Sequence, residues 1–239
     1  MLKDTLSRAA PFATKLVPPV SGIVRVFEGK GGQKVAKIAG IAEDDDYLLL
    51  RCWVPRFRES GRGFAGWSYC GLFFAMDVAV GGGYGAADQM LSIKFPHNAP
   101  NELLYERAGY LWACSFLNKH IGKGIIPSTH MRSIAKDMIR DGKRLANKSR
   151  CPLMYEWNSE RYWGAAHGLA GIVHALMGVN LNEDDLKYVK GTLNYMINNR
   201  FISGNYPSIE GFNADWLVHW CHGAPGVALT LTKAARIRE

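Results

Sequence analysis

The sequence predicts an all-α fold built from repeated helical hairpins, and three observations support this. From residue 98 onward, apolar residues recur with the 3.6-residue period of amphipathic helices. Shorter, more apolar segments that open on small residues lie between those helices. These segments return at near-constant spacing, which is typical of stacked αα-hairpins. Residues 1–97 show no such pattern, so we treat 1–97 as an unassigned N-terminal region and 98–239 as the helical domain.

Two segments have the pattern of outer, amphipathic helices. In "STHMRSIAKDMIRDGKRLANK", Ser128 or Thr129 is available as the N-cap. In "NEDDLKYVKGTLNYMINNRF", Asn182 is the expected cap and acidic residues fill the first turn. The apolar residues expected on the buried faces are Met131, Ile134, Ala135, Met138 and Leu145 in the first segment, and Leu186, Val189, Leu193 and Ile197 in the second.

Three apolar segments alternate with these helices: "ERAGYLWACSFL", "AAHGLAGIVHAL" and "CHGAPGVALTL". Gly109, Gly171 and Gly226 hold equivalent places in them, 62 and 55 residues apart. Glycine permits a sharp turn, and the helix start that follows offers backbone N–H groups and the positive end of the helix dipole. We therefore expect these helices to line the inside of a ring, with their glycine-rich starts gathered at one rim.

Composition places the chain among ordinary globular proteins. Of its 239 residues, 48% are apolar and 21% charged, which excludes intrinsic disorder as the general state. The formal net charge of +8 favours anionic partners without naming one, and no apolar run is long enough to span a bilayer. The five cysteines are odd in number and scattered, which favours a reducing, cytoplasmic location over a secreted disulfide framework; they are Cys52, Cys70, Cys114, Cys151 and Cys221.

Two glycine motifs carry a family resemblance. "RYWGAAHGLAGI" and "LVHWCHGAPGVAL" resemble the lanthionine synthetase C-like (LanC-like) family, and "ELLYERAGYLWACSFLNKHIG" looks like its plant members in particular. The resemblance implies an α/α toroid of seven hairpins around a central cavity, of which this chain would form an incomplete, open arc. It also implies peptide modification: bacterial members add a cysteine thiol to dehydrated serine or threonine with zinc as the activator. Eukaryotic members bind glutathione and are implicated in adding it to dehydroamino acids.

The resemblance also implies site residues. Cys221 matches the first zinc ligand, His167 matches the proposed acid/base histidine, and Glu102 stands where bacterial enzymes carry a catalytic aspartate. The other two zinc ligands belong to a second "CHG" repeat that this sequence does not contain, so we expect an incomplete zinc site, less than one bound zinc and impaired activity. Zinc ionises a thiol, and the enolate that forms when a thiolate adds to an alkene needs a proton, which an imidazole can supply.

Each of these residues has a structural alternative. His167 could be a packing or capping residue, and Cys221 an inert buried thiol. We expect His174 to be a hydrogen-bonded core histidine. His219 and His222 are constrained by the same glycine turn as the cysteine, so they are poor candidates for completing a tetrahedral site. The remaining cysteines are expected to be structural.

Two further signals point to other functions. "FFAMDVAVGGGYGA" fits a strand followed by the dinucleotide-binding pattern at Gly81, Gly83 and Ala86, but Pro96 cuts short the helix that should follow. A basic stripe recurs every four residues along the first amphipathic helix, and it fits either a solvated outer face or contact with anionic membrane lipids. Aromatic residues do not interleave with the stripe, which argues against nucleic acid. The stripe comprises Arg132, Lys136, Arg140, Arg144 and Lys148.

Three hypotheses for function follow. The first is a zinc- and glutathione-dependent protein of the LanC-like family that acts on peptides in the cytoplasm. The second is a non-catalytic, truncated member that associates with peptides or peripherally with the plasma membrane. The third is a nucleotide-binding oxidoreductase that uses the Gly81 loop. Zinc content and glutathione affinity distinguish the first two, and a titration with a reduced cofactor tests the third.

Overall fold

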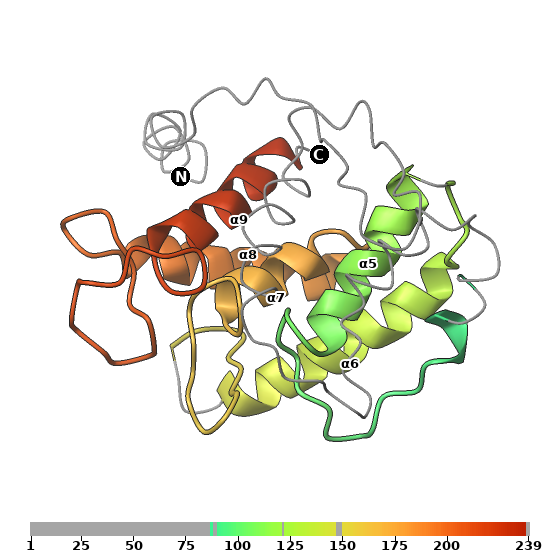
Figure 1. Cartoon of the computed structure of the whole chain (residues 1–239), viewed down its shortest axis with the longest axis horizontal. Coiled ribbons are helices and arrows are strands. Elements are labelled where there is room, and N and C mark those ends of the chain that lie inside the picture. The colour runs from blue at the N-terminus through green and yellow to red at the C-terminus, as the bar shows by residue number, and fades with distance from the viewer. Residues whose placement is uncertain (1–86, 88–89, 121, 147–149, 238–239) are drawn as a thin grey trace, which may run out of the picture.

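The computed structural model describes residues 87, 90–120, 122–146 and 150–237 (Figure 1). Within these ranges the chain forms helices and no strand, apart from isolated β-bridges. The all-α prediction is therefore confirmed for this part of the chain. The helices are α5 (Arg107–His120), α6 (Ser128–Ala146), α7 (Leu169–Leu176), α8 (Glu183–Asn198) and α9 (Ala224–Arg236).

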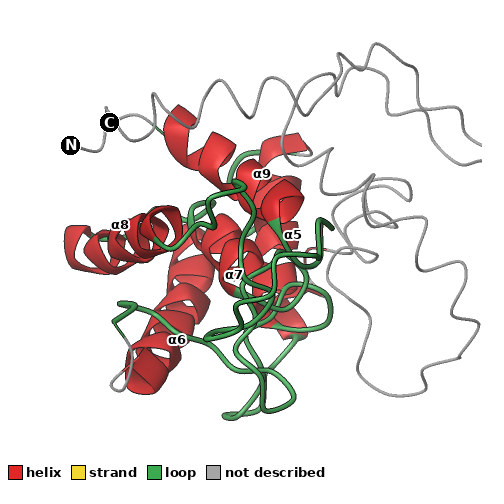
Figure 2. Ribbon diagram, turned by 90° about the vertical axis from the view of Figure 1, so that its left-hand side faces the viewer, coloured by secondary structure: helices red, strands yellow, loops and turns green. Residues whose placement is uncertain are grey.

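The helices form two rows. Helix α7 contacts α5 and α9, so these three make one row, whereas α6 packs on α5 and α8 packs on α7. Helices α6 and α8 also touch each other, and Figure 2 shows them beside the row of α5, α7 and α9. Consecutive hairpins α5–α6 and α7–α8, with the apolar helix of each pair inside, are the expected arrangement of an α/α toroid.

Burial follows the apolar pattern. All eight residues of α7 are buried, because "LAGIVHAL" is apolar on every side except at His174. Helix α6 buries one face, including four of the five residues predicted for it, with Leu145 half-buried. Helix α8 buries Val189 and Leu193, and its other two predicted residues, Leu186 and Ile197, are half-buried.

The two predicted N-caps have different outcomes. The side chain of Asn182 accepts a hydrogen bond from the backbone N–H of Asp185 at 2.8 Å, so this cap is confirmed. Ser128 is already the first residue of α6, so the cap predicted at Ser128 or Thr129 is wrong. The carbonyl of Pro127 instead accepts the N–H groups of His130 and Met131.

A buried ion pair joins the first hairpin. Arg107, at the start of α5, donates to Asp141 of α6 at 2.7 Å, and the two side chains are 5% and 9% exposed. The same guanidinium donates to Asn101 at 3.3 Å and to the carbonyls of Pro96 and His97 at 3.1 Å each. This cation therefore fixes α5, α6 and the segment before α5 to one another.

The basic stripe of α6 lies on its exposed face. Arg140 pairs with Asp137 at 2.7 Å, and Arg144 lies 3.6 Å from Asp141. Pairing with acids of the same helix is the ordinary state of a solvated face. Contact of this stripe with a membrane stays a prediction, and Lys148 lies outside the described residues. No helix in the described ranges is long and apolar enough to cross a membrane.

Several predictions concern residues 1–86, which lie outside the described part of the chain. These are the dinucleotide-binding loop of Gly81, Gly83 and Ala86, and the structural roles of Cys52 and Cys70.

Candidate functional site

Three loops meet at the N-terminal ends of α5, α7 and α9. The backbone N–H of Leu103 donates to the carbonyl of Ala166 at 3.1 Å, which joins the first loop to the second. The N–H of Ala165 donates to the carbonyl of Trp220 at 3.3 Å, which joins the second loop to the third. The expected gathering of the glycine-rich starts at one rim is therefore what the structure has. The loops comprise residues 101–106, 162–168 and 217–223.

The equivalence of Gly109, Gly171 and Gly226 is confirmed, because each is the third residue of its helix. Gly168 and Gly223 are the N-caps of α7 and α9. The first repeat has no glycine before α5, which begins at Arg107. A tight turn over residues 103–106, ahead of α5, takes the place that a capping glycine has in the other two repeats.

Close backbone contact, more than sharp turning, explains the repeated glycines. A Cβ atom on Gly171 would overlap the carbonyl oxygen of Ala165, and one on Gly226 would overlap that of Trp220. In both repeats the carbonyl belongs to the residue six positions earlier, so the two segments share one backbone arrangement. Gly223, the N-cap of α9, has a backbone φ of 126°, a conformation that residues with a Cβ atom rarely adopt.

Gly164 of the second loop lies against the backbone of Cys221 in the third loop, and we expect Gly164→Ala to separate the two loops. Its added Cβ would overlap the backbone carbonyl of Cys221, and backbone has little room to shift. The free energy of unfolding should fall by about 2–3 kcal/mol. Urea unfolding followed by circular dichroism measures it. Gly211→Ala is the control: φ is 78° there and nothing lies within 4 Å, so the cost should be about 1 kcal/mol. Equal costs for the two variants would contradict the close-contact explanation.

Glu102 and His167 are in direct contact. Nδ1 of His167 lies 2.8 Å from Oε2 of Glu102. The carboxylate also accepts the backbone N–H groups of Leu104 at 2.9 Å and Tyr105 at 2.5 Å. Because an ionised carboxylate only accepts, Nδ1 carries the proton of this bond, and Nε2 is left as the basic nitrogen of the neutral ring. Glu102 is 1% exposed and the His167 side chain 15%, so the imidazole is the member that a substrate can reach.

Aromatic rings hold the imidazole in place. Trp157 stacks on His167 with ring centroids 3.8 Å apart and planes 5° apart. Tyr105 lies nearly parallel to His167 at 6.3 Å, and Tyr162 is tilted at 5.9 Å. Trp157 was not identified from the sequence. The signal available was the "WNSE" turn, in which Asn158 and a positive-φ neighbour reverse the chain and bring the indole back over the histidine.

Cys221 lies on the third loop and is buried at 9% exposure. The ring of the next residue, His222, lies 5.4 Å from the ring of Tyr162, which also borders His167. The structure thus brings Cys221 onto the loop beside the Glu102–His167 pair. No group of three His, Cys, Asp or Glu side chains that could hold a metal ion occurs among the described residues.

His174 is a core residue of α7, at 1% exposure. The expectation that it is hydrogen-bonded was wrong: within the described residues neither ring nitrogen has a partner. Burial, and secondarily the charge of Lys233, holds the pKa of His174 well below its ordinary value. The ring is therefore neutral at physiological pH and has no part in the site above.

Two of the cysteines expected to be structural are buried. Burial raises the pKa of Cys114 and of Cys151 to about 12 each. A thiol with such a pKa is almost entirely protonated at neutral pH and is a poor nucleophile. Their structural interpretation therefore agrees with their surroundings.

Comparison with known proteins gives consistent matches. Residues 85–239 match the family described as lanthionine synthetase C-like protein. Over 138 residues the chain is 48% identical to LanC-like protein GCL1 of Arabidopsis thaliana, an alignment that covers 57% of this chain and 32% of that protein. Over 145 residues it is 41% identical to glutathione S-transferase LANCL1 of Danio rerio, covering 58% of this chain and 36% of that protein. The chain spans about a third of the length of the curated relatives it matches.

Proposed function

Because the chain belongs to the lanthionine synthetase C-like family, we propose that it takes part in adding the thiol of glutathione to dehydroamino acid residues of peptides. In this proposal the Glu102–His167 pair performs the proton transfer. The observation that carries it is the 2.8 Å contact of the partly accessible imidazole with a buried carboxylate. The glutathione in the name of the zebrafish relative supports the choice of thiol.

The reaction needs one thiolate and one proton. The glutathione sulfur forms a bond to the β-carbon of the dehydroamino acid, and the electron pair of the C=C bond moves onto the α-carbon and its carbonyl group. A proton must then reach the α-carbon, and His167 supplies it from Nε2 after taking it from the incoming thiol. Glu102 holds the opposite ring nitrogen and stabilises the imidazolium that forms between the two transfers, so it acts as a positioning residue.

Zinc has no step in this scheme. Where it is bound it would ionise the thiol, and Cys221 would be one of its ligands. The described residues do not assemble three ligands, and a tetrahedral site needs at least that number, so they do not by themselves fit the metal. A zinc content below one per molecule stays a prediction for metal analysis of the purified chain.

The proposal can be tested without the metal. Near pH 7.5 most glutathione is still the protonated thiol, so addition requires a base that takes the thiol proton and returns it to the α-carbon, which is the role proposed for His167. The 239-residue chain is mixed with glutathione and a dehydroalanine peptide, and mass spectrometry follows the adduct. We expect saturable acceleration over the protein-free reaction. His97→Ala, which removes an exposed imidazole elsewhere, should keep the acceleration. Saturable peptide binding without acceleration would contradict the proposal and favour the non-catalytic hypothesis.

A further inference from the structure

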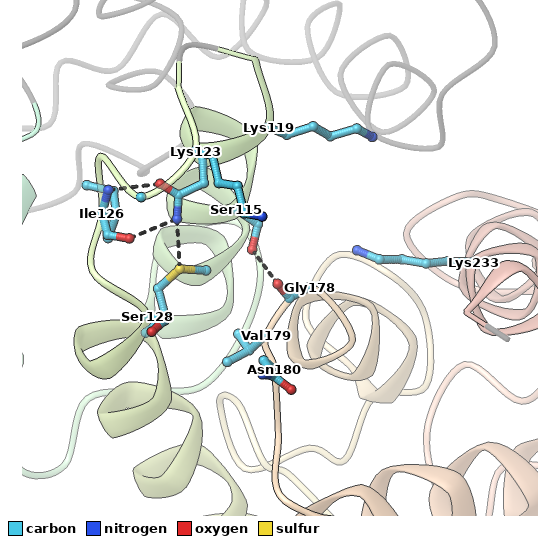
Figure 3. A pocket seen from close by; sticks show the side chains of 12 residues that line it. Ser115, Lys119, Lys123, Ile126, Ser128, Gly178, Val179, Asn180 and Lys233 are labelled. Carbon is cyan, nitrogen blue, oxygen red and sulfur yellow. Dashed lines mark hydrogen bonds between the residues drawn. The ribbon is translucent and has the colours of Figure 1, made fainter. Parts of the chain in front are cut away.

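Aromatic side chains distinguish the two ends of the inner helices. At the C-terminal end, a cavity of about 590 Å³ is bordered by the second half of α5, the segments after α5 and α7, and Lys233 of α9. None of the described residues that line this cavity is aromatic (Figure 3). At the N-terminal end, where the three loops meet, aromatic rings surround His167; they are Trp157, Tyr162 and Tyr105. The imidazole of the proposed proton transfer therefore has aromatic neighbours that the other end of these helices lacks.

Trp157 makes the closest of these ring contacts, and its geometry suits a charged partner. The ring centroids are 3.8 Å apart and the planes differ by 5°, so the indole lies flat on one face of the imidazole. Two uncharged rings prefer an offset or edge-to-face arrangement with centroids about 4.5–7 Å apart. A cation is attracted to the ring face, because the π-electrons make that face negative. Tyr162, tilted by 58° at 5.9 Å, has the arrangement that uncharged rings prefer.

The turn that carries Trp157 is held in a conformation that costs free energy. Asn158 and Ser159 have φ angles of 48° and 64°, in the left-handed region that residues with a Cβ atom rarely adopt. The backbone groups of Trp157 and Glu160 close the turn with hydrogen bonds of 2.9 and 3.1 Å. Residues in such conformations are concentrated at functional sites, where the surrounding structure holds them. Here the turn holds the indole over His167.

The contacts of His167 approach its ring from different directions. Nδ1 is bound to Glu102 at 2.8 Å in the plane of the ring, and Trp157 covers one face. Neither contact uses Nε2, the nitrogen that exchanges protons in the proposed reaction. Because the side chain is 15% exposed, little water surrounds the ring, and protein groups must stabilise a positive charge on it. The carboxylate supplies a full negative charge, and the indole supplies the partial negative charge of its face.

From this arrangement we infer that Trp157 stabilises the imidazolium form of His167 and thereby accelerates the addition of the thiol; the inference rests on the proposed function. Nε2 takes the proton of the thiol, and the ring is positively charged while the sulfur forms its bond to the β-carbon. The ring then returns the proton to the α-carbon and becomes neutral. A group that favours the charged ring lowers the free energy of the transition state in which the S–C bond forms. Trp157 acts through His167, so it is a positioning residue.

Rate measurements on the whole chain test the inference, with glutathione and a dehydroalanine peptide near pH 7.5. Trp157→Leu keeps an apolar side chain without a ring face, and kcat should fall about 10- to 30-fold while KM for the peptide changes less than about twofold. Trp157→Phe keeps a weaker ring face and should lose only about threefold in kcat. Trp216→Leu removes an indole that is 70% exposed elsewhere, and should keep the rate.

Fluorination separates the charge of the ring face from its packing. The chain has seven tryptophans, and growth on 5-fluorotryptophan replaces all of them. Fluorine withdraws electrons from the indole face but changes its size little, so kcat of the wild type should fall about twofold. In the Trp157→Phe background no indole lies on His167, so the same replacement should change kcat by less than about 1.2-fold.

The outcomes distinguish this inference from the proposed function. If the wild type accelerates the addition but Trp157→Leu keeps its kcat, the inference fails and the proposed function stands. Equal slowing by Trp157→Leu and Trp157→Phe, with the same effect of fluorine in both backgrounds, would mean that the indole only packs, which also overturns the inference. A wild type that does not accelerate the addition overturns both.

Discussion

Replacement of Arg107 by methionine should lower the free energy of unfolding by about 3–5 kcal/mol, which is the usual cost of removing one partner from a buried ion pair. The cost arises because the carboxylate of Asp141, at 9% exposure, loses its one buried partner and keeps only the longer contacts to the exposed side chains of Arg140 at 3.9 Å and Arg144 at 3.6 Å. The variant also removes the donor to Asn101 and to the carbonyls of Pro96 and His97, so the segment before α5 loses three of the hydrogen bonds that hold it. Urea unfolding of the 239-residue chain measures the loss.

Two control variants make the Arg107 result specific. Arg132→Met removes an exposed arginine of α6 and should change stability by less than about 0.5 kcal/mol. Arg107→Met combined with Asp141→Leu removes both charges and should recover most of the stability, because an apolar pair needs no counter-ion. A loss below about 1 kcal/mol in the single variant would mean that water or another group compensates Asp141.

Helix type and the buried faces could be predicted because they depend on local pattern. The apolar period of α6 and α8 identifies the side that packs inward, and the cap at Asn182 depends on a side chain three residues from its partner. The start of α6 was placed wrongly because a backbone carbonyl, that of Pro127, satisfies its first N–H groups. Every residue carries the same backbone carbonyl, so the sequence does not show which carbonyl will accept the first N–H groups of a helix.

Contacts between distant segments were the part that sequence reasoning missed. Arg107 and Asp141 lie 34 residues apart, and nothing in either local pattern indicates that the two charges are buried together. The sequence identifies the repeated glycines but suggests turning as the reason for them. The reason is a carbonyl six residues earlier in two of the repeats, which becomes visible only once the loop has folded back.

The site residues were found through resemblance, and the structure adds the relation between them. Glu102 and His167 are 65 residues apart, yet they share a hydrogen bond because the first and second loops pair at Leu103 and Ala166. For Trp157 the "WNSE" turn was the available signal, but it indicates only that the chain reverses there and not that the indole stacks on the imidazole of His167.

His167→Ala should slow glutathione addition in the assay near pH 7.5 by about 10²–10⁴-fold, which is the usual contribution of general acid–base catalysis. The reason is that Glu102 is nearly fully buried and already engaged with two backbone N–H groups, so it cannot take over the transfer of a proton to substrate. Helix content should be unchanged, because His167 precedes α7 and packs on Trp157 without entering the core. The rate of adduct formation and the circular dichroism spectrum measure the two expectations.

His167→Asn separates proton transfer from packing. Its side-chain amide can donate to Glu102 in place of Nδ1, so the loop keeps its hydrogen bond while the titratable ring is lost. If His167 moves protons, the asparagine variant should be as slow as the alanine variant, and added imidazole should restore part of the rate of His167→Ala by occupying the space beside Trp157. If His167 only caps or packs, the asparagine variant should keep most of the rate and free imidazole should have no effect. That outcome would remove the catalytic assignment and leave the Glu102–His167 bond as a structural link between the first and second loops.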